Sequence, residues 1–452
     1  MQNIYIKNLG PIKEIHMDIN RINLLIGEQA TGKSTIAKGI YFFRLIKTNV
    51  IDYLCQLSDG ISISNINNVN KDVRCVKVLK GQFKDIFVRL FGKSWDLKDD
   101  MYLKYHFSDD IWIDVALKNG QKKYLSVRFS KKLNYAIREL EGQVRKISEA
   151  SAKTITSIAF ATAERIRNHE IIKKSVNEIF NDEEETYYIP AGRSLLTTMA
   201  NSKSLIMTAG KNMDLITEQF MQIIDNIRGY FKEGLSSAHK YYPDGKRKYN
   251  MQYLIAEIIE MLHGEYFFEN GEEYLLIDDK TNNNGKIEIN FASSGQQEIL
   301  WLINYLYVLI LRKEKAFVII EEPEAHIYPS LQKKIVELII MFANLNESKV
   351  LLTTHSPYVL NAVNNAYYAG VLCQEKQQIE SEIEKIIGRY KMIHYGALSA
   401  YKIQHENNAQ LENLFDDEAR EICSYKIDEI SQEFNETYTK LYNIELDYAN
   451  ED

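Results

Sequence analysis

Several features that would assign the chain to a familiar class are scarce or missing. Among 452 residues there are only four cysteines, far apart and without a C-x-x-C pair, so neither a disulfide framework nor a zinc site is expected. No run of 18 apolar residues occurs, so no membrane-spanning helix and no membrane partner is expected. The start of the chain, MQNIYIKNLGPIKEI, lacks the basic segment and apolar core of a signal peptide. A cytoplasmic protein is therefore the simplest expectation.

Charge is unevenly distributed along the chain. The net charge is −7, but residues 404–452 alone carry −11, which leaves +4 for the rest. Within that rest, residues 118–146 hold nine Lys and Arg side chains against two Glu. This basic stretch is either a surface that binds a phosphate backbone, with DNA as the partner, or a solvated face of a hairpin and a helix. The acidic tail is either a docking surface or a solvated pair of amphipathic helices.

The most informative stretch is RINLLIGEQATGKSTIAKGI, residues 21–40. Its apolar run predicts a buried strand, its end predicts a helix, and the connection fits G-x-x-x-x-G-K-[ST], the pattern of a phosphate-binding loop. Lys33 would reach the β- and γ-phosphates of ATP, and the Ser34 hydroxyl would bind Mg²⁺. The predicted ATP-binding residues are Gly27, Glu28, Gln29, Ala30, Thr31, Gly32, Lys33, Ser34 and Thr35. The alternative, a chance match, loses weight with the motifs that follow.

A second turn suited to anions opens the apolar helix predicted over residues 292–312. Its sequence is Ser293-Ser294-Gly295-Gln296. Small and hydroxyl-bearing residues at a helix N-terminus favour anion binding, because the free backbone N–H groups point at the ligand. An ordinary helix cap is the alternative for such a turn.

Two further apolar runs end in polar side chains. FVIIEEPEAHIYP, residues 317–329, predicts a buried strand that ends at Glu321 and Glu322, the latter 27 residues after the glycine of the serine turn. KVLLTTHSPYVL predicts another buried strand, which ends at His355, 33 residues after Glu322. Carboxylates at such a place suit Mg²⁺ binding and general-base catalysis. The alternatives are a solvated acidic turn and an ordinary core or surface histidine.

Together, these four motifs resemble the ABC-type ATPase head shared by RecF, SMC and OLD-family proteins. The resemblance is closest to the stand-alone ATPases of bacterial anti-phage systems such as Septu and PARIS. It implies an α/β fold, a P-loop head with a mixed sheet, flanking helices and an inserted helical and β region. The stretch TYYIPAGRS, residues 186–194, also resembles an IPA-x-R-S segment of this group, but no role follows for Arg193.

The resemblance also implies a role for each motif. Lys33, Glu322 and His355 would be catalytic, with Glu322 as general base and His355 at the γ-phosphate. Ser34 and Glu321 would hold Mg²⁺. The serine turn would be the signature motif, which contacts the ATP of a second subunit, although Ala292 stands where Leu is usual and Ser294 replaces a Gly. The signature residues are Ser293, Ser294, Gly295 and Gln296.

The distances between motifs predict the organisation of the chain. Lys33 and Ser293 are 260 residues apart, more than a transporter ATPase domain allows and less than the coiled coils of SMC proteins need. We expect an ATPase core over 1–50 and 272–375. The insertion would span 51–271, β-rich over 71–130 and helical over 134–265, and an acidic, mostly helical region would span 376–452. The β-like runs include VRCVKVL, residues 73–79, and two runs that flank a hairpin turn at Asn119-Gly120.

These observations favour an ATP-dependent switch with ATP and Mg²⁺ as cofactors and slow, regulatory hydrolysis. Two subunits would form a head-to-tail dimer, or a higher oligomer, around ATP. No nuclease motif follows His355, so the gated effector, a nuclease of an anti-phage system, is expected on a separate chain. One alternative is a RecF-like ATPase that repairs DNA or senses its structure. Another is an assembly scaffold that keeps ATP bound without hydrolysing it.

Overall fold

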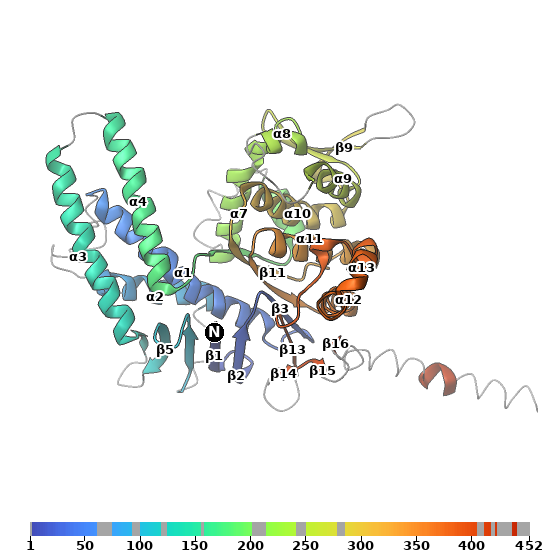
Figure 1. Cartoon of the computed structure of the whole chain (residues 1–452), viewed down its shortest axis with the longest axis horizontal. Helices are drawn as coiled ribbons and strands as arrows, with labels where there is room; N and C mark the ends of the chain where they lie inside the picture. The colour runs from blue at the N-terminus through green and yellow to red at the C-terminus, as the bar shows by residue number, and fades with distance from the viewer. Residues whose placement is uncertain are drawn as a thin grey trace, which may run out of the picture.

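A six-stranded, largely parallel sheet forms the centre of the computed structural model (Figure 1). Its strand order is β14-β13-β3-β12-β11-β7, and only β14 runs antiparallel to its neighbour. The strands are β3 (Ile22–Gly27), β7 (Glu185–Ile189), β11 (Ala316–Glu321), β12 (Lys349–Thr354), β13 (Leu398–Ile403) and β14 (Leu411–Asn413). The structure describes residues 2–60, 75–92, 100–118, 124–154, 158–200, 214–240, 250–277, 285–404, 411–416, 421–422 and 436–440.

Both faces of this sheet are covered, which explains why its strands are continuous apolar runs. Successive residues of a strand point to opposite faces. Accordingly, Val318 and Ile320 of β11 pack in one hydrophobic cluster, while Phe317 and Ile319 pack in another. The first cluster includes, among others, side chains of α10 (Ser294–Arg312), α11 (Pro329–Leu345) and α12 (Pro357–Glu375). The second includes α1 (Lys33–Ser58).

A second, antiparallel sheet packs against α1 through the same second cluster. Its order is β2-β1-β4-β5-β6, so β1 pairs on one side with β2 and on the other with β4, about 100 residues later. The strands are β1 (Gln2–Leu9), β2 (Ile12–Ile19), β4 (Tyr102–His106), β5 (Trp112–Lys118) and β6 (Tyr124–Phe129). The last two pair as the predicted hairpin, and the turn itself, Asn119-Gly120, lies outside the described residues.

The remaining elements surround these two sheets. In Figure 1, α3 (Lys131–Thr154) and α4 (Ile158–Phe180) lie side by side and project from the antiparallel sheet. A three-stranded sheet, β10-β9-β8, lies near α8 and α9. The other helices are α2 (Cys75–Phe91), α5 (Arg193–Ala200), α7 (Leu215–Arg228), α8 (Leu235–Lys240), α9 (Met251–Leu262) and α13 (Glu380–Ile387); the other strands are β8 (Glu265–Glu269), β9 (Glu272–Ile277), β10 (Gly285–Glu288), β15 (Phe415–Asp416) and β16 (Glu421–Ile422). Short 3-10 turns are η1 (Gly229–Phe231), η2 (Ile289–Phe291), η3 (Gln377–Ile379) and η4 (Arg389–Lys391).

The predicted α/β class, with a mixed sheet and flanking helices, is confirmed. The strand predicted over 73–79 is wrong, because residues from Cys75 onward form α2. The alternating valines of VRCVKVL imitate a strand, but the buried side chains Val76, Leu79, Phe83, Phe87 and Leu90 follow the three-to-four spacing of one helix face.

Three strands of the central sheet come from outside the segments predicted as the core. Strand β7 lies within the predicted insertion, and β13 and β14 lie within the C-terminal region expected to be mostly helical. The insertion and the C-terminal region therefore complete the sheet, and the domain bounds otherwise stay a prediction. Within the described part of the chain, no helix combines the length and the apolar character that crossing a membrane requires.

Candidate functional site

The phosphate-binding loop connects β3 to α1. Gly32 adopts a φ of 110°, and a Cβ atom there would lie 2.9 Å from Cγ1 of Ile12, so only glycine fits. The Lys33 ammonium joins the end of the loop to its start, because its Nζ donates to the carbonyl oxygens of Gly27 at 2.8 Å and Glu28 at 2.7 Å. Glu28 is exposed, as are Gln29, Ala30 and Ser34, so the loop is open to a ligand.

Three parallel strands bring the other predicted catalytic residues to this loop. Strands β3, β12 and β11 are neighbours in the sheet, so their carboxyl ends meet at one edge. There, Lys33 Nζ lies 3.4 Å from His355 Nδ1, and His355 Nε2 lies 3.2 Å from Oε1 of Glu322. The three residues therefore form one connected chain across the edge of the sheet.

This chain has a defined direction for hydrogen bonding. An ammonium group can only donate, so the contact with Lys33 requires His355 Nδ1 to accept. A neutral imidazole then carries its proton on Nε2, which faces the Glu322 carboxylate. In this arrangement Glu322 is held as an acceptor, the state in which a carboxylate can take a proton from water.

Burial and charge act in opposite directions on Lys33. Burial lowers the pKa of its ammonium group to about 8, although the carboxylates of Glu322, Glu324, Glu321 and Glu28 raise it. Near pH 8, the neutral and charged forms of Lys33 therefore have similar free energies before a ligand binds. Phosphate groups would favour the charged form, because they bring further negative charge to the ammonium.

The residues predicted for Mg²⁺ fit a hard cation. Glu321 is 8% exposed, and its buried Oε1 makes no well-formed hydrogen bond, although the Tyr188 hydroxyl lies close enough to interact with the carboxylate. A buried carboxylate oxygen without a partner is costly unless a cation or a donor satisfies it. No group of three or more His, Cys, Asp or Glu side chains in the described ranges is placed to hold a metal by itself. Glu321 and Ser34 would therefore hold Mg²⁺ jointly with ATP.

Sequence reasoning missed Glu324, which fixes the position of His355. Its Oε1 accepts from the Thr354 hydroxyl at 2.6 Å and from the backbone N–H of His355 at 2.7 Å. The segment E-P-E, which starts at Glu322, was the available signal, but a carboxylate two residues after the strand has many uses. Arg193, which the sequence leaves without a role, is also fully buried next to this edge of the sheet.

The serine turn is a helix cap as well as an exposed surface. Ser293 Oγ accepts from the N–H of Gln296 at 3.3 Å, and the Gln296 side chain accepts from the N–H of Ser293 at 3.0 Å. The capping alternative therefore describes the geometry. Ser293 and Ser294 are nevertheless exposed, and a Cβ at Gly295 would lie 3.2 Å from the carbonyl oxygen of His326. Gly295 therefore lies close to the loop after β11, whereas Lys33, His355 and Glu322 meet at the phosphate-binding loop.

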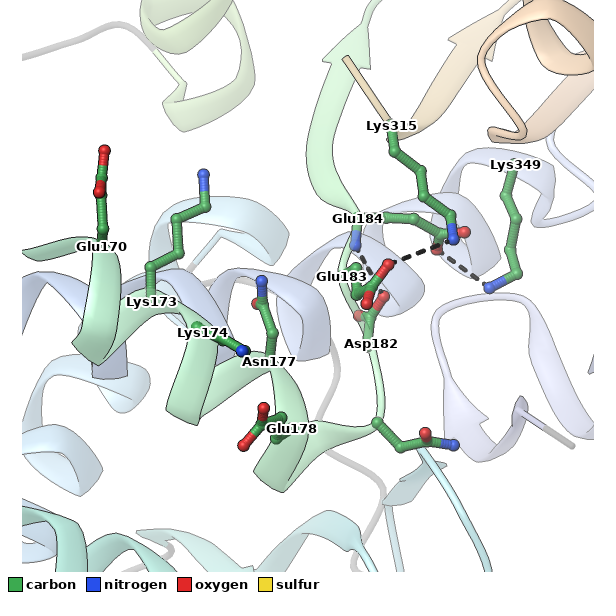
Figure 2. Close-up of a pocket in the computed structure, with 11 residues that line it drawn as sticks. Glu170, Lys173, Lys174, Asn177, Glu178, Asp182, Glu183, Glu184, Lys315 and Lys349 are labelled. Atoms are coloured by element: carbon green, nitrogen blue, oxygen red, sulfur yellow. Dashed lines mark hydrogen bonds and ion pairs between the residues drawn. The ribbon is translucent and has the colours of Figure 1, made fainter. Parts of the chain in front are cut away.

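A separate cavity of about 650 Å³ lies at the opposite end of the strands (Figure 2). Its lining includes residues at the amino ends of β7, β11 and β12, whereas the phosphate-binding loop follows the carboxyl end of β3. Lysines and carboxylates pair along one side of it, with Lys349 Nζ 3.0 Å from Glu184 Oε2 and Lys315 Nζ 3.5 Å from Glu183 Oε2. Because its charges compensate one another, this cavity does not resemble a triphosphate site.

The parallel sheet and the loop at its edge define a P-loop nucleotide-binding fold. The chain belongs to the AAA ATPase domain family, whose model matches residues 1–360. This membership supports ATP as the nucleotide and an ATPase as the class of enzyme. No curated protein matches the chain.

Among solved structures, three SMC heads are similar to the chain at a low level. The first is the SmcHead bound to the C-winged helix domain of ScpA, with 10% identity, coverage of 92% of this chain and 98% of that one, and a TM-score of 0.37. The SMC head domain from Thermotoga maritima has 9% identity, 80% and 90% coverage and a TM-score of 0.33. The Smc head with an extended coiled coil, bound to the C-terminal domain of ScpA derived from Pyrococcus furiosus, has 10%, 93% and 98%, and 0.37. Because this similarity is low, the function of the chain is inferred from the residues of its own site.

Proposed function

We propose that this chain is an ATP-hydrolysing switch that closes as a head-to-tail dimer around ATP and Mg²⁺ and gates a separate effector. The observation that carries the proposal is the chain from Lys33 through His355 to Glu322, with contacts of 3.4 and 3.2 Å. It joins a phosphate-binding cation to a carboxylate that can act as a base.

Each residue has a step that its chemistry suits. The backbone of the loop and Lys33 bind the phosphates, and the ion that Ser34 and Glu321 hold would neutralise charge on them. Glu322 orients and deprotonates the attacking water, while His355 lies between that carboxylate and Lys33, where the γ-phosphate would contact it. Hydrolysis removes the bound γ-phosphate, and with it the contacts that keep two heads together.

The exposed signature supports a second copy as the partner. Ser293 and Ser294 are exposed, and Phe291 just before them is 80% exposed. On the loop after β11, Tyr328 is 77% exposed. Two large exposed aromatic side chains near the signature favour a surface that a protein covers. In the proposed dimer, the signature of one subunit completes the ATP site of the other.

The test uses Glu322→Gln, which keeps the shape of the side chain and removes the base. With ATP and Mg²⁺, this variant should elute as a dimer, because the closed state no longer decays by hydrolysis. Adding Ser294→Arg should return it to a monomer that still binds ATP. A Glu322→Gln protein that stays monomeric with saturating ATP would disprove the sandwich.

The proposed effector is the nuclease of a bacterial anti-phage system. Its support is the resemblance of the motifs to stand-alone ATPases of such systems, together with the acidic residues 404–452, which offer a basic partner a docking surface. The test is to co-express Glu322→Gln with its genomic neighbours and to purify this chain in ATP and Mg²⁺. A nuclease retained with ATP and released when the wild type hydrolyses it would establish gating.

A second candidate, a DNA-responsive ATPase, is favoured by a cluster of cations. Burial lowers the pKa of Lys80, and the nearby charges of Arg138 and Lys84 lower it further, although Asp114 raises it. Lys84 Nζ also lies 5.9 Å from the centre of the Tyr124 ring. Like charges gathered beside an aromatic ring suit a phosphate backbone.

The basic stretch at 118–146 contributes less to this surface than its composition indicates. Three of its cations are paired with carboxylates, namely Arg128 with Asp114, Lys132 with Asp110 and Arg145 with Glu141. Lys122 and Lys123 lie outside the described residues. The cluster around Lys80 is therefore the better target for mutation.

The test compares charge reversal at Lys80 and Lys84 with reversal at Lys376 and Lys385, two exposed lysines at the other end of the chain. Duplex DNA should raise the ATPase rate of the wild type and of the control pair, and the Lys80 and Lys84 pair should lose this response. Equal stimulation of both pairs would exclude this surface, and no stimulation of the wild type by duplex DNA would remove the DNA candidate.

A further inference from the structure

Arg193 is fully buried between three segments that contribute to the nucleotide site. Its side chain donates to four main-chain carbonyls: Pro190 at 2.9 Å, Glu298 at 2.9 Å, Glu321 at 2.7 Å and Glu322 at 2.9 Å. Two of these carbonyls belong to the acidic pair at the end of β11. The planar guanidinium can reach several acceptors at fixed angles, which a lysine ammonium cannot reproduce.

Glu298 connects the same arginine to the helix that begins with the signature. It is fully buried in α10, four residues after Ser294, and its Oε1 lies 3.2 Å from the guanidinium. Its two carboxylate oxygens also accept from the backbone N–H groups of Arg193 at 3.0 Å and Ser194 at 2.9 Å. The carboxylate thus caps α5 and pairs with the arginine at once.

Glu322 needs such support, because its backbone is in an unfavourable conformation. Its φ is 44°, in the left-handed region that is unfavourable for a residue with a side chain. Its N–H donates to the carbonyl of Thr353 at 2.9 Å, and its own carbonyl accepts from Arg193 at 2.9 Å and from the N–H of Ala325 at 3.1 Å. Arg193 is the side chain in this set that also reaches the signature helix.

We infer that Arg193 is a positioning residue for hydrolysis. It holds the backbone of Glu322 so that the carboxylate meets His355, and through Glu298 it fixes that backbone to the signature helix of the same subunit. The inference rests on the proposed function, because it takes Glu322 as the general base. It adds a physical link between the surface that a second subunit covers and the residue that activates water.

The test is Arg193→Lys, with Arg44→Lys as a matched control. Arg44 is also fully buried and also donates to several partners, among them Asp182, Glu184 and Gln2, but it lies at the other end of the sheet. At a temperature at which circular dichroism shows both variants folded, Arg193→Lys should lower kcat about 100-fold with KM within about threefold of the wild type. Arg44→Lys should keep kcat within about threefold.

A double variant separates positioning from general loosening of the fold. If Arg193 acts through Glu322, adding Arg193→Lys to Glu322→Gln should leave single-turnover hydrolysis at the rate of Glu322→Gln alone. A further loss as large as that of Arg193→Lys by itself would overturn the inference, as would an unchanged kcat or an equal loss in Arg44→Lys. If Arg193→Lys does not fold, Glu298→Gln tests the inference instead. We expect this variant to lower kcat about tenfold, and an unchanged kcat would contradict the link between Arg193 and the signature helix.

The two proposals fail in different ways. Equal rates for the wild type and Glu322→Gln would refute the proposed function. A strong loss in Glu322→Gln combined with normal turnover in Arg193→Lys would refute only the role of Arg193.

Discussion

Lys33 has a pKa near the pH at which ATPases are commonly assayed, because burial lowers it to about 8 while four neighbouring carboxylates raise it. Its contacts are with two carbonyls of its own loop and with His355, so before ATP binds no anion compensates the ammonium directly. Binding of the phosphates changes this balance, and the protein must take up a proton whenever Lys33 starts neutral.

The first prediction follows from that uptake. Above about pH 8, ATP affinity should fall with pH, approaching tenfold per unit, because the phosphates bind best to the charged form. Calorimetry in two buffers of different ionisation enthalpy should show nearly one proton taken up at about pH 9. An affinity that is flat from about pH 8 to about pH 9.5 would contradict the low pKa. Lys33→Arg, which stays charged, should bind without proton uptake wherever it binds.

At the residue scale, the sequence predicts those site residues that belong to one continuous motif or directly follow an apolar run. Gly27 to Thr35 form one loop, and Glu321, Glu322 and His355 each follow an apolar run, so parallel strands bring them together. Arg193 and Glu298 are 105 residues apart, and the contact between them depends on how α5 packs on α10. No local pattern signals such a pair, which is why the arginine of IPAGRS had no role until its four carbonyl partners were seen.

At the scale of elements, α1 is held at its first residue and in its middle. Its first residue is Lys33, and in its interior Arg44 and Lys47 reach the segment before β7, with Arg44 2.9 Å and Lys47 3.5 Å from Asp182 Oδ2. Burial raises the pKa of the Asp182 carboxyl, but the charges of Arg44 and Lys47 outweigh it and bring that pKa down to about 2. This network connects the phosphate-binding helix to the central sheet.

The second prediction concerns this network. Asp182→Asn should cost about 3–5 kcal/mol in the free energy of unfolding, because it leaves Arg44 buried without its main counter-charge. The urea midpoint at neutral pH measures it. The exposed pair of Asp110 and Lys132 supplies the control, since Asp110→Asn should cost less than about 1 kcal/mol. Since the folded pKa is depressed, the contribution of Asp182 is full above about pH 4 and is lost as the pH falls toward 2.

Helix α2 shows how an element can be mispredicted. Its start, Cys75 to Leu79, has the alternating β-branched residues of a strand, and the helical spacing becomes clear only with Phe83 and Phe87. The three-to-four spacing extends over the whole helix and packs it on α1 and α3, which decides the structure. Strand β7 is the opposite case. Its sequence predicts a strand, but nothing local indicates that it joins β11 in the central sheet.

At the scale of the whole molecule, ATP binding and dimerisation should be separable. The loop proposed to bind ATP and the exposed serine turn proposed as the signature are different surfaces. On that turn Ser293 caps α10, while Ser294 makes none of the capping bonds. Replacing Ser293 would cost about 1 kcal/mol of helix stability. Ser294→Arg blocks the surface and keeps the cap, so it is the appropriate substitution for testing assembly.

The third prediction uses this separation. In Glu322→Gln, ATP with Mg²⁺ should raise Tm, since a ligand at 100 times its Kd adds about 2.7 kcal/mol to the folded state. This Tm should also rise with protein concentration, because the closed dimer gains by mass action. Adding Ser294→Arg should remove the dependence on protein concentration and keep the rise that ATP gives to one head. If Tm with ATP were independent of protein concentration in Glu322→Gln itself, each head would bind its nucleotide alone, and the exposed signature would need another partner than a second copy of this chain.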